Sequence, residues 1–160
     1  MGADEAQTDL TVTNVDALQE VARRGGVPLS TRHSGKVLDV AGGSMDPGAP
    51  VIQFKGLDQP NQRFRVEPVR ADLVGVIAVH SGLVLDVAGA SQDDGAPLVQ
   101  FPCHGGDNQL FRIEPTNGDL VFVAAHSGKV LDVAGVSNKS GAPVTQFSRN
   151  FQANQQWFFR

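Results

Sequence analysis

The apolar residues of this chain occur in short runs separated by turn-forming residues. In residues 73–115 the runs are LVGVIAV, LVLDVAG, PLVQF and QLFRIEP. Val, Ile and Phe dominate these runs, and Gly, Pro, Asn and Asp lie between them, which is the pattern of short β-strands joined by turns. Because none of the runs belongs to a long helical pattern, the sequence predicts an all-β fold.

One decapeptide occurs three times in nearly the same form. It reads HSGKVLDVAG at 33–42, HSGLVLDVAG at 80–89 and HSGKVLDVAG at 126–135. The blocks that follow also recur in order, as GAPVIQF, GAPLVQF and GAPVTQF, and then as NQRFRV, NQLFRI and NQQWFF. The first histidines of successive copies are 47 and 46 residues apart. The chain therefore contains three repeats, which span 27–69, 73–115 and 120–160.

The number and similarity of the repeats indicate how they are arranged. Each repeat predicts four short strands, and the Ser-Gly pair between the first two predicts a hairpin turn. A β-propeller usually has four or more blades, and a solenoid needs distinct capping repeats. Three copies this similar instead favour closure about a pseudo-threefold axis, which is the arrangement of a β-trefoil. We expect one β-trefoil domain over 27–160, preceded by an N-terminal extension at 1–26.

The N-terminal extension differs in character from the repeats. It carries five acidic residues against two arginines, which is most of the net negative charge. Its segment TNVDALQEVARRGG predicts a short helix that Thr13 or Asn14 could cap, with Gly25 as a stop signal. We expect this helix to pack on one end of the trefoil. The alternatives are a dimerisation arm, which would make the protein a homodimer, and the remnant of a preceding domain.

Composition narrows the possible partners and compartments. The net charge of −4 argues against a nucleic-acid partner, which needs a basic stripe, and against an anionic membrane surface. Cys103 is the single cysteine, so no disulfide forms within the chain. The N-terminus lacks the basic and apolar regions of a signal peptide, and no apolar run approaches the length of a membrane span. These features predict a protein that stays in the cytoplasm or is released without a signal peptide, with no membrane insertion.

Three triplets with the pattern Gln-x-aromatic carry a family resemblance. They are Gln62-Arg63-Phe64, Gln109-Leu110-Phe111 and Gln155-Gln156-Trp157, each behind an LDV block. In this arrangement the chain resembles the ricin-B type β-trefoil lectins, also called QxW lectins, over residues 27–160. The branch that it resembles most consists of fungal and bacterial lectins without secretion signals. The resemblance implies a carbohydrate-binding protein without catalytic activity, cofactor or metal, which binds glycans that contain galactose or N-acetylgalactosamine.

The resemblance also implies one shallow sugar pocket in each repeat, with one Asp, Gly, aromatic, Asn and Gln per pocket. The candidate residues are Asp39, Gly42, Phe54, Asn61 and Gln62 in the first repeat, Asp86, Gly89, Phe101, Asn108 and Gln109 in the second, and Asp132, Gly135, Phe147, Asn154 and Gln155 in the third.

The chemistry of these residue types suits a sugar. A carboxylate accepts charge-assisted hydrogen bonds from two neighbouring hydroxyls, and an amide both donates and accepts. An aromatic ring packs on the CH face of a pyranose, and glycine allows close approach to the backbone. We therefore expect the three aspartates to point out of their strands toward a ligand, with exposed carboxylates, while Leu38, Leu85 and Leu131 point into the core.

The sequence departs from the family pattern near the aromatic ring. Family members often carry a site glutamine two residues before the ring, where this chain has Ile52, Val99 and Thr145. The glutamines directly before the ring, Gln53, Gln100 and Gln146, should face away from the pocket because strand side chains alternate.

Structural roles compete with binding at several of these positions. The glutamine of each triplet is more readily explained as a partner of buried backbone groups than as a sugar contact. The aspartates could instead cap turns. Three histidines, His33, His80 and His126, could converge on a metal, but each precedes a Ser-Gly turn, so we expect hydrogen-bonding turn residues.

Two functional classes are compatible with the sequence. The first is a lectin with up to three sites, of which we expect the second to be the strongest because its loop HGGDNQ is compact and rich in glycine. The second is a protein-interaction trefoil, such as a protease inhibitor that acts through one loop, since one fold hosts unrelated functions.

Overall fold

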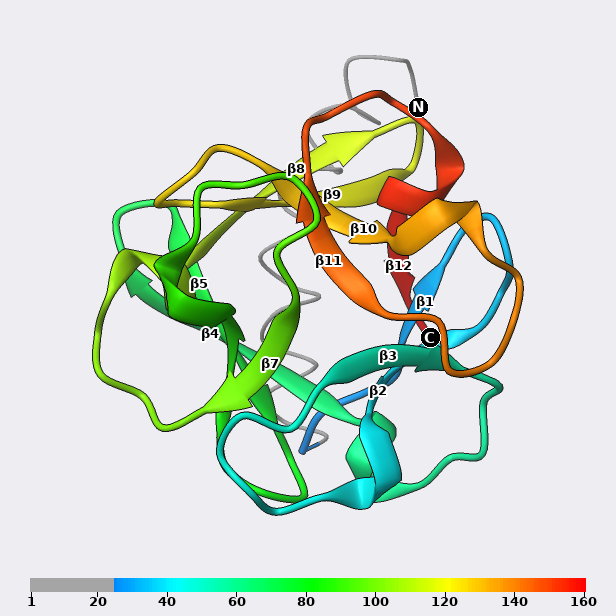
Figure 1. Cartoon of the computed structure of the whole chain (residues 1–160), viewed down its shortest axis with the longest axis horizontal. Coiled ribbons are helices and arrows are strands. Elements are labelled where there is room, and N and C mark those ends of the chain that lie inside the picture. The colour runs from blue at the N-terminus through cyan, green and yellow to red at the C-terminus, as the bar shows by residue number, and fades with distance from the viewer. Residues whose placement is uncertain (1–24) are drawn as a thin grey trace, which may run out of the picture.

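The computed structural model describes residues 25–160 (Figure 1). The predicted leader helix, in TNVDALQEVARRGG, therefore lies outside the described residues except for its expected stop at Gly25.

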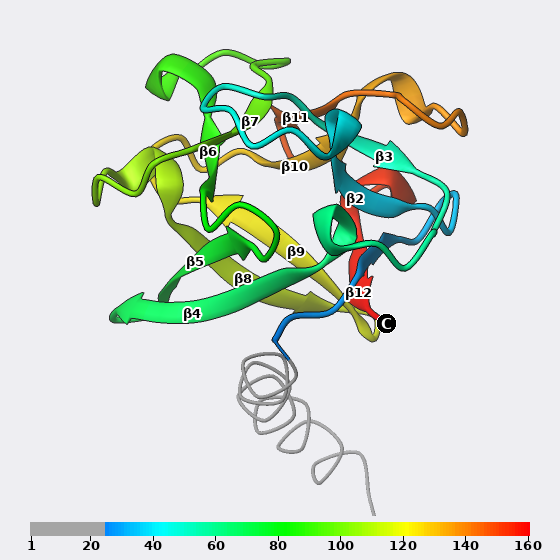
Figure 2. The same ribbon diagram turned by 90° about the horizontal axis from the view of Figure 1, so that it is seen from below.

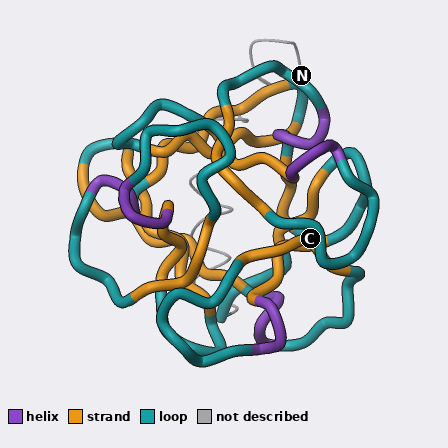
Figure 3. The backbone as a smooth tube through the Cα atoms, viewed as in Figure 1, coloured by secondary structure: helices purple, strands orange, loops and turns teal. Residues whose placement is uncertain are grey.

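Twelve strands form the fold, four from each repeat, as the sequence predicts. They are β1 (Leu29–Thr31), β2 (Val37–Val40), β3 (Val51–Phe54), β4 (Phe64–Arg70), β5 (Leu73–Ala78), β6 (Val84–Val87), β7 (Leu98–Phe101), β8 (Phe111–Thr116), β9 (Asp119–Ala124), β10 (Val130–Val133), β11 (Val144–Phe147) and β12 (Trp157–Phe159). The helices of the described part are three-residue 3-10 turns: η1 (Ala41–Gly43), η2 (Pro60–Gln62), η3 (Ala88–Ala90), η4 (Asp107–Gln109), η5 (Ala134–Val136) and η6 (Ala153–Gln155). They lie in three places around the rim (Figure 3).

Six of the strands close into a barrel. The pairing runs β1, β12, β9, β8, β5, β4, with every pair antiparallel. An isolated bridge between Val27, just before β1, and Phe64 at the start of β4 completes the ring. The barrel thus has no long open edge of the kind that invites aggregation.

The other six strands form three hairpins that cover one end of the barrel. They are β2–β3, β6–β7 and β10–β11, and each pairs four residues with four. The side view shows them as a layer above the barrel strands (Figure 2). The second strands of the hairpins, β3, β7 and β11, meet one another around the centre. This arrangement is a β-trefoil with pseudo-threefold symmetry, which confirms the fold predicted from the repeats.

Apolar residues from all three repeats share one core. Leu38, Leu85 and Leu131 are at most 1% exposed, so the expectation that they point inward is confirmed. The aromatic residues of the three Gln-x-aromatic triplets, Phe64, Phe111 and Trp157, lie in the same cluster. Full burial of a side chain of this size is worth roughly 1.5–3 kcal/mol, so these residues stabilise the fold and do not form part of a surface site.

A second set of buried residues is polar and connects neighbouring repeats. Gln53, Gln100 and Gln146 are 0% exposed. In the second repeat, Gln100 Nε2 donates to the Ser44 and Asp46 carbonyls of the preceding repeat, and Gln100 Oε1 accepts from Ser81 Oγ at 2.8 Å. The other two glutamines make equivalent bonds. Because strand side chains alternate, these residues face away from Phe54, Phe101 and Phe147, as expected.

The three histidines of the decapeptides reach the same carbonyl groups. The Nε2 atoms of His33, His80 and His126 each donate at 2.7 Å, to the Ser137, Ser44 and Ser91 carbonyls respectively. Each carbonyl therefore accepts from one histidine and one glutamine. This agrees with the expected role of the histidines as hydrogen-bonding turn residues, and residues 25–160 hold no cluster of ligands for a metal ion.

We predict that Gln100→Leu lowers the free energy of unfolding by about 2–4 kcal/mol. Leucine fills the space but removes three hydrogen bonds, one to each of the Ser44 and Asp46 carbonyls and one from the Ser81 hydroxyl, which loses its acceptor, and a lost hydrogen bond of this kind costs about 0.5–1.5 kcal/mol. Chemical denaturation measures the change, with Gln59→Leu as the control because Gln59 is exposed. Equal stabilities for the two variants would contradict the structural role of this residue.

Candidate functional site

Four of the five candidate residues in the second repeat line one pocket. Asp86 lies in β6, Gly89 in η3, Phe101 at the end of β7 and Asn108 in η4, around a cavity of about 470 Å³. The ring of Phe101 is 40% exposed. The pocket thus combines a carboxylate, an amide and an accessible aromatic face, as the sequence predicted.

The third repeat forms an equivalent pocket of about 440 Å³. Asp132, Gly135, Phe147 and Asn154 line it, and Phe147 is also 40% exposed. In the first repeat, Asp39 and Asn61 come together, with Asn61 Nδ2 at 3.4 Å from Asp39 Oδ1. One oxygen of Asp39 is therefore already engaged by the neighbouring amide.

The fifth candidate of each repeat lies behind its aspartate. Gln62, Gln109 and Gln155 are at most 2% exposed. Each donates Nε2 to Oδ2 of its aspartate at 2.9 Å, and to a loop carbonyl at 2.9–3.0 Å. These glutamines do not line the second and third pockets, where Asp86 and Asp132 lie. They position the aspartate, in agreement with the structural explanation that the sequence favoured for them.

The expectation that the aspartate carboxylates are exposed is wrong. Asp39, Asp86 and Asp132 are each 4% exposed, because the hairpin and the following 3-10 turn enclose them. Burial raises the pKa of all three, and the bond from the glutamine opposes that shift. Only a small part of each carboxylate is therefore accessible from solvent, and the glutamine amide is its main hydrogen-bond donor within the protein.

The asparagines are oriented by the backbone so that they present an acceptor. Nδ2 of Asn61, Asn108 and Asn154 donates to the carbonyls of Val40, Val87 and Val133 at 3.1–3.2 Å. The amide oxygen is then turned away from that carbonyl, and Asn154 Oδ1 is buried without a hydrogen-bond partner among the described residues. Since both the carboxylate and this oxygen accept hydrogen bonds, the pocket suits a ligand with adjacent hydroxyl donors and disfavours an anion.

One wall of each pocket comes from the preceding repeat. Gly48 borders the second pocket and Gly95 the third. Their N–H groups donate to the Gln100 and Gln146 carbonyls, at 2.7 and 2.8 Å, which fixes the loops against the pocket. Gly141 bonds the Gln53 carbonyl in the same way. The sequence did not reveal this contribution, because it depends on contacts between repeats.

His104 is a rim residue that the sequence pattern did not reveal. It lines the second pocket, with Nε2 at 3.7 Å from Asp86 Oδ2 and its ring edge-on to Phe101, at 6.3 Å between ring centres. Its Nδ1 accepts from the Gly106 N–H at 3.0 Å, so neutral His104 carries its proton on Nε2, a donor on the pocket rim.

Asn150 is the equivalent of His104 in the third pocket. Its Oδ1 accepts from Gln152 N at 3.0 Å, which leaves Nδ2 as a donor. The first repeat has Leu57 at this place. In all three repeats the backbone N–H of this residue donates to Oε1 of the triplet glutamine, which is Gln62, Gln109 or Gln155. The only sequence signal for this position is that it lies three residues after each ring.

A family model for the ricin-type β-trefoil lectin domain matches residues 60–147 and 117–160. Together these segments cover more than half of the chain. The chain belongs to the ricin-type β-trefoil lectin family. Membership confirms the resemblance drawn from the triplets and supports carbohydrate binding.

Solved structures agree with this assignment. A designed three-fold symmetric protein, ThreeFoil, shares 43% identity with a TM-score of 0.82, and the match covers 84% of this chain and 97% of that one. An exo-β-1,3-galactanase from Clostridium thermocellum shares 32% identity with the same TM-score, but the 84% of this chain that matches spans only 29% of the enzyme. The ricin B-like lectin of Macrolepiota procera, solved with lactose, shares 18% identity with a TM-score of 0.71, over 83% of this chain and 92% of that one.

Family and fold together favour a carbohydrate-binding lectin without catalytic activity, although the galactanase is an enzyme. No curated protein matches this lectin by sequence. Among the helices of residues 25–160, none is long and apolar enough to cross a membrane.

We predict that Asp86→Asn unfolds at a higher temperature than the wild-type lectin at pH 7. Burial raises the folded-state pKa of Asp86, so the folded protein favours the protonated carboxyl. The stabilisation from this proton is fully present below the unfolded-state pKa and is lost as the pH rises through the folded-state pKa. Asparagine removes the buried charge and keeps an oxygen for the Gln109 amide. The gain should shrink as the pH falls through the raised pKa, since the aspartic acid is then neutral too.

Thermal unfolding at pH 7 and in acid measures this difference. Asp72→Asn is the matched control, because Asp72 is exposed. A lower melting temperature for Asp86→Asn at pH 7 would show that the ionised carboxylate stabilises the fold.

Proposed function

We propose that this lectin binds glycans that contain galactose or N-acetylgalactosamine, through up to three sites centred on Asp39, Asp86 and Asp132. The observation that carries the proposal is the pairing, in each repeat, of a carboxylate held by glutamine with an asparagine oxygen turned away from the backbone. Two adjacent acceptors suit two neighbouring hydroxyls of a pyranose. The exposed faces of Phe101 and Phe147 suit its CH surface.

Similar proteins support this choice of sugar. The Macrolepiota procera lectin was solved with lactose, and the enzyme from Clostridium thermocellum is named as a β-1,3-galactanase. N-acetylgalactosamine enters through the family resemblance of the Gln-x-aromatic triplets. We infer no catalytic step, because the proposed sites offer acceptors and a ring for binding.

The three sites should differ in affinity, with the second the strongest and the first the weakest. The second site adds the Nε2–H donor of His104 to two acceptors. In the first site the ring of Phe54 is half-buried, and Leu57 supplies no donor. A site with millimolar affinity is worth only about −4 kcal/mol, so useful binding to a dense glycan surface would come from several sites acting together.

We predict that each Asp→Asn substitution removes one site. Loss of a charge-assisted acceptor costs about 1.5–3 kcal/mol, which corresponds to about 10–100-fold in affinity. Double variants isolate single sites, so Asp39→Asn with Asp132→Asn leaves only the second. Titration of the double variants with galactose and with N-acetylgalactosamine, followed by NMR, then ranks the sites.

Asparagine is preferable to alanine in this test because the carboxylates are buried. Alanine would also remove the partner of the glutamine, so lost binding could not be separated from lost stability. Asp72→Asn again serves as the control. Unchanged sugar affinity in a correctly folded Asp86→Asn variant would reject the second site, and unchanged affinity in all three would reject the proposed function.

A further inference from the structure

A groove on the side of the barrel lies in each of the first two repeats, separate from the proposed sugar pockets, and an arginine stands at the equivalent place in the third. The residue that marks this place is Gly56 in the first repeat, Cys103 in the second and Arg149 in the third. Each lies directly before the loop residue described above, which is Leu57, His104 or Asn150. We call the three sites the Gly56, Cys103 and Arg149 grooves. The Gly56 groove has a volume of about 550 Å³ and the Cys103 groove about 290 Å³. The groove that holds the cysteine is thus smaller than the groove that holds the glycine.

In the Arg149 groove the chain's own arginine occupies the space. Arg149 Nη1 donates to Glu114 Oε1 at 2.7 Å, and Arg112 Nε donates to the other oxygen of Glu114 at 2.8 Å. Glu114 lies in β8 opposite Val121, which belongs to a buried cluster with Val123 and Val130. The Arg149 guanidinium also lies 5.1 Å from the centre of the Phe151 ring. This groove therefore holds a guanidinium between a carboxylate and an aromatic ring.

The Cys103 groove keeps the same carboxylate but lacks the arginine. The segment FRVEP at 64–68 corresponds to FRIEP at 111–115, so Glu67 takes the place of Glu114. Glu67 lies opposite Gly75 in β5, as Glu114 lies opposite Val121 in β9. Its side chain is 50% exposed, and Arg65 approaches it at 3.6 Å, as Arg112 approaches Glu114. Ile77 and Val84 line the apolar side of the groove.

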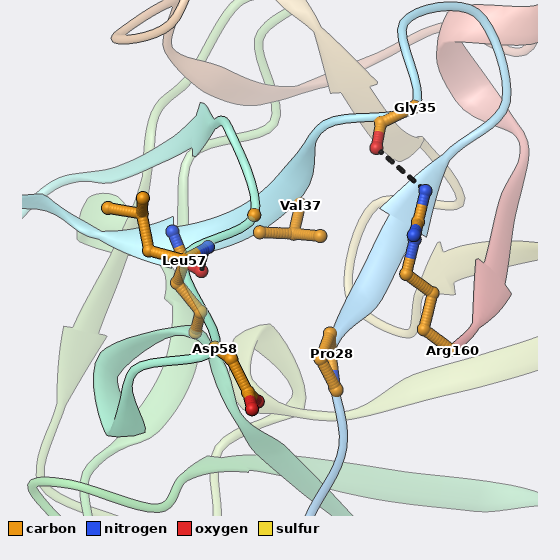
Figure 4. Close-up of a pocket in the computed structure, with 8 residues that line it drawn as sticks. Pro28, Gly35, Val37, Leu57, Asp58 and Arg160 are labelled. Atoms are coloured by element: carbon orange, nitrogen blue, oxygen red, sulfur yellow. Dashed lines mark hydrogen bonds between the residues drawn. The ribbon is translucent and has the colours of Figure 1, made fainter.

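The Gly56 groove has different chemistry. Arg160 stands where the other two grooves have a glutamate, and its Nη2 donates to the Gly35 carbonyl at 3.3 Å (Figure 4). Asp58 lies across the groove from it, and its carboxylate is paired with Arg63. A cation at this position repels a second cation, so the Gly56 groove does not match the Arg149 groove.

We propose that the Cys103 groove is a docking site for an arginine side chain presented by a partner protein. The Arg149 groove is the template for the complex. The guanidinium of the partner donates to Glu67 beside Arg65, and its aliphatic stem covers Ile77 and Val84. A planar guanidinium suits this role better than an ammonium, because it pairs with a carboxylate through two parallel donors. The surface is independent of sugar binding, since Cys103 and His104 border different cavities.

The test uses an acetylated and amidated peptide, Gly-Arg-Asn-Phe-Gly, whose centre copies residues 149–151. NMR titration of the lectin should shift the backbone signals of Gly75, Ile77 and Gly105. A peptide with citrulline, which has the same shape without the charge, should bind about tenfold more weakly because the charged hydrogen bond is lost. The arginine peptide should also slow the alkylation of Cys103, the only thiol in the chain.

Two variants locate the site. Glu67→Gln should weaken binding as much as citrulline does, while Glu114→Gln, the equivalent change in the filled groove, should leave it unchanged. Cys103→Arg supplies the arginine within the chain and should abolish binding of the peptide. Equal binding of the arginine and citrulline peptides, an unaffected Glu67→Gln variant, or shifts confined to the Gly56 groove would each overturn the proposal. Glu67 is exposed, so its substitution tests the site even where Cys103→Arg fails to fold.

Discussion

The buried side chains of Gln53, Gln100 and Gln146 are the interaction on which the rest of this structure depends. Each one joins the Ser-Gly turn of its own repeat to two carbonyls of a neighbouring repeat, which for Gln53 is the third. No hairpin of the cap is complete by itself, because the side-chain NH2 group of its glutamine finds its acceptors only in a neighbouring repeat. The same carbonyl-bearing loops supply Gly48 and Gly95 to the pocket walls. Closure of the trefoil and construction of the pockets therefore come from one set of hydrogen bonds.

Stability and ligand binding compete at the aspartates. Burial raises the pKa of Asp86, so the ionised carboxylate costs folding free energy at neutral pH. The Gln109 amide offsets part of that cost by donating to Oδ2. A neutral isostere would remove the cost of burying a charge and would serve equally well as a structural partner. The proposed sugar ligand, with its hydroxyl donors, would account for a carboxylate at all three positions.

Much of the architecture could be predicted from the sequence because the repeats carry it. The strands, the trefoil closure and the meeting of Asp86, Gly89, Phe101 and Asn108 all follow from residues that recur in register. The burial of the aspartates could not be predicted, because it depends on how the 3-10 turn folds over the hairpin. The roles of His104 and Asn150 were missed for a different reason: this position varies among the repeats, so a search for recurrent residues passes over it.

Positions that vary among the repeats carry information of another kind. Gly56 and Cys103 line side grooves, Arg149 pairs with Glu114 at the equivalent place, and the next residue in two of these loops, His104 or Asn150, lines a proposed sugar pocket. Neighbouring residues of one loop thus serve two different surfaces, as expected where an extended segment points alternate side chains in opposite directions. The backbone of the loop is held by the same bond to the triplet glutamine in every repeat. Each surface can therefore change by single substitutions without disturbing the other or the core, which explains how one repeated scaffold carries unequal pockets and unequal side grooves.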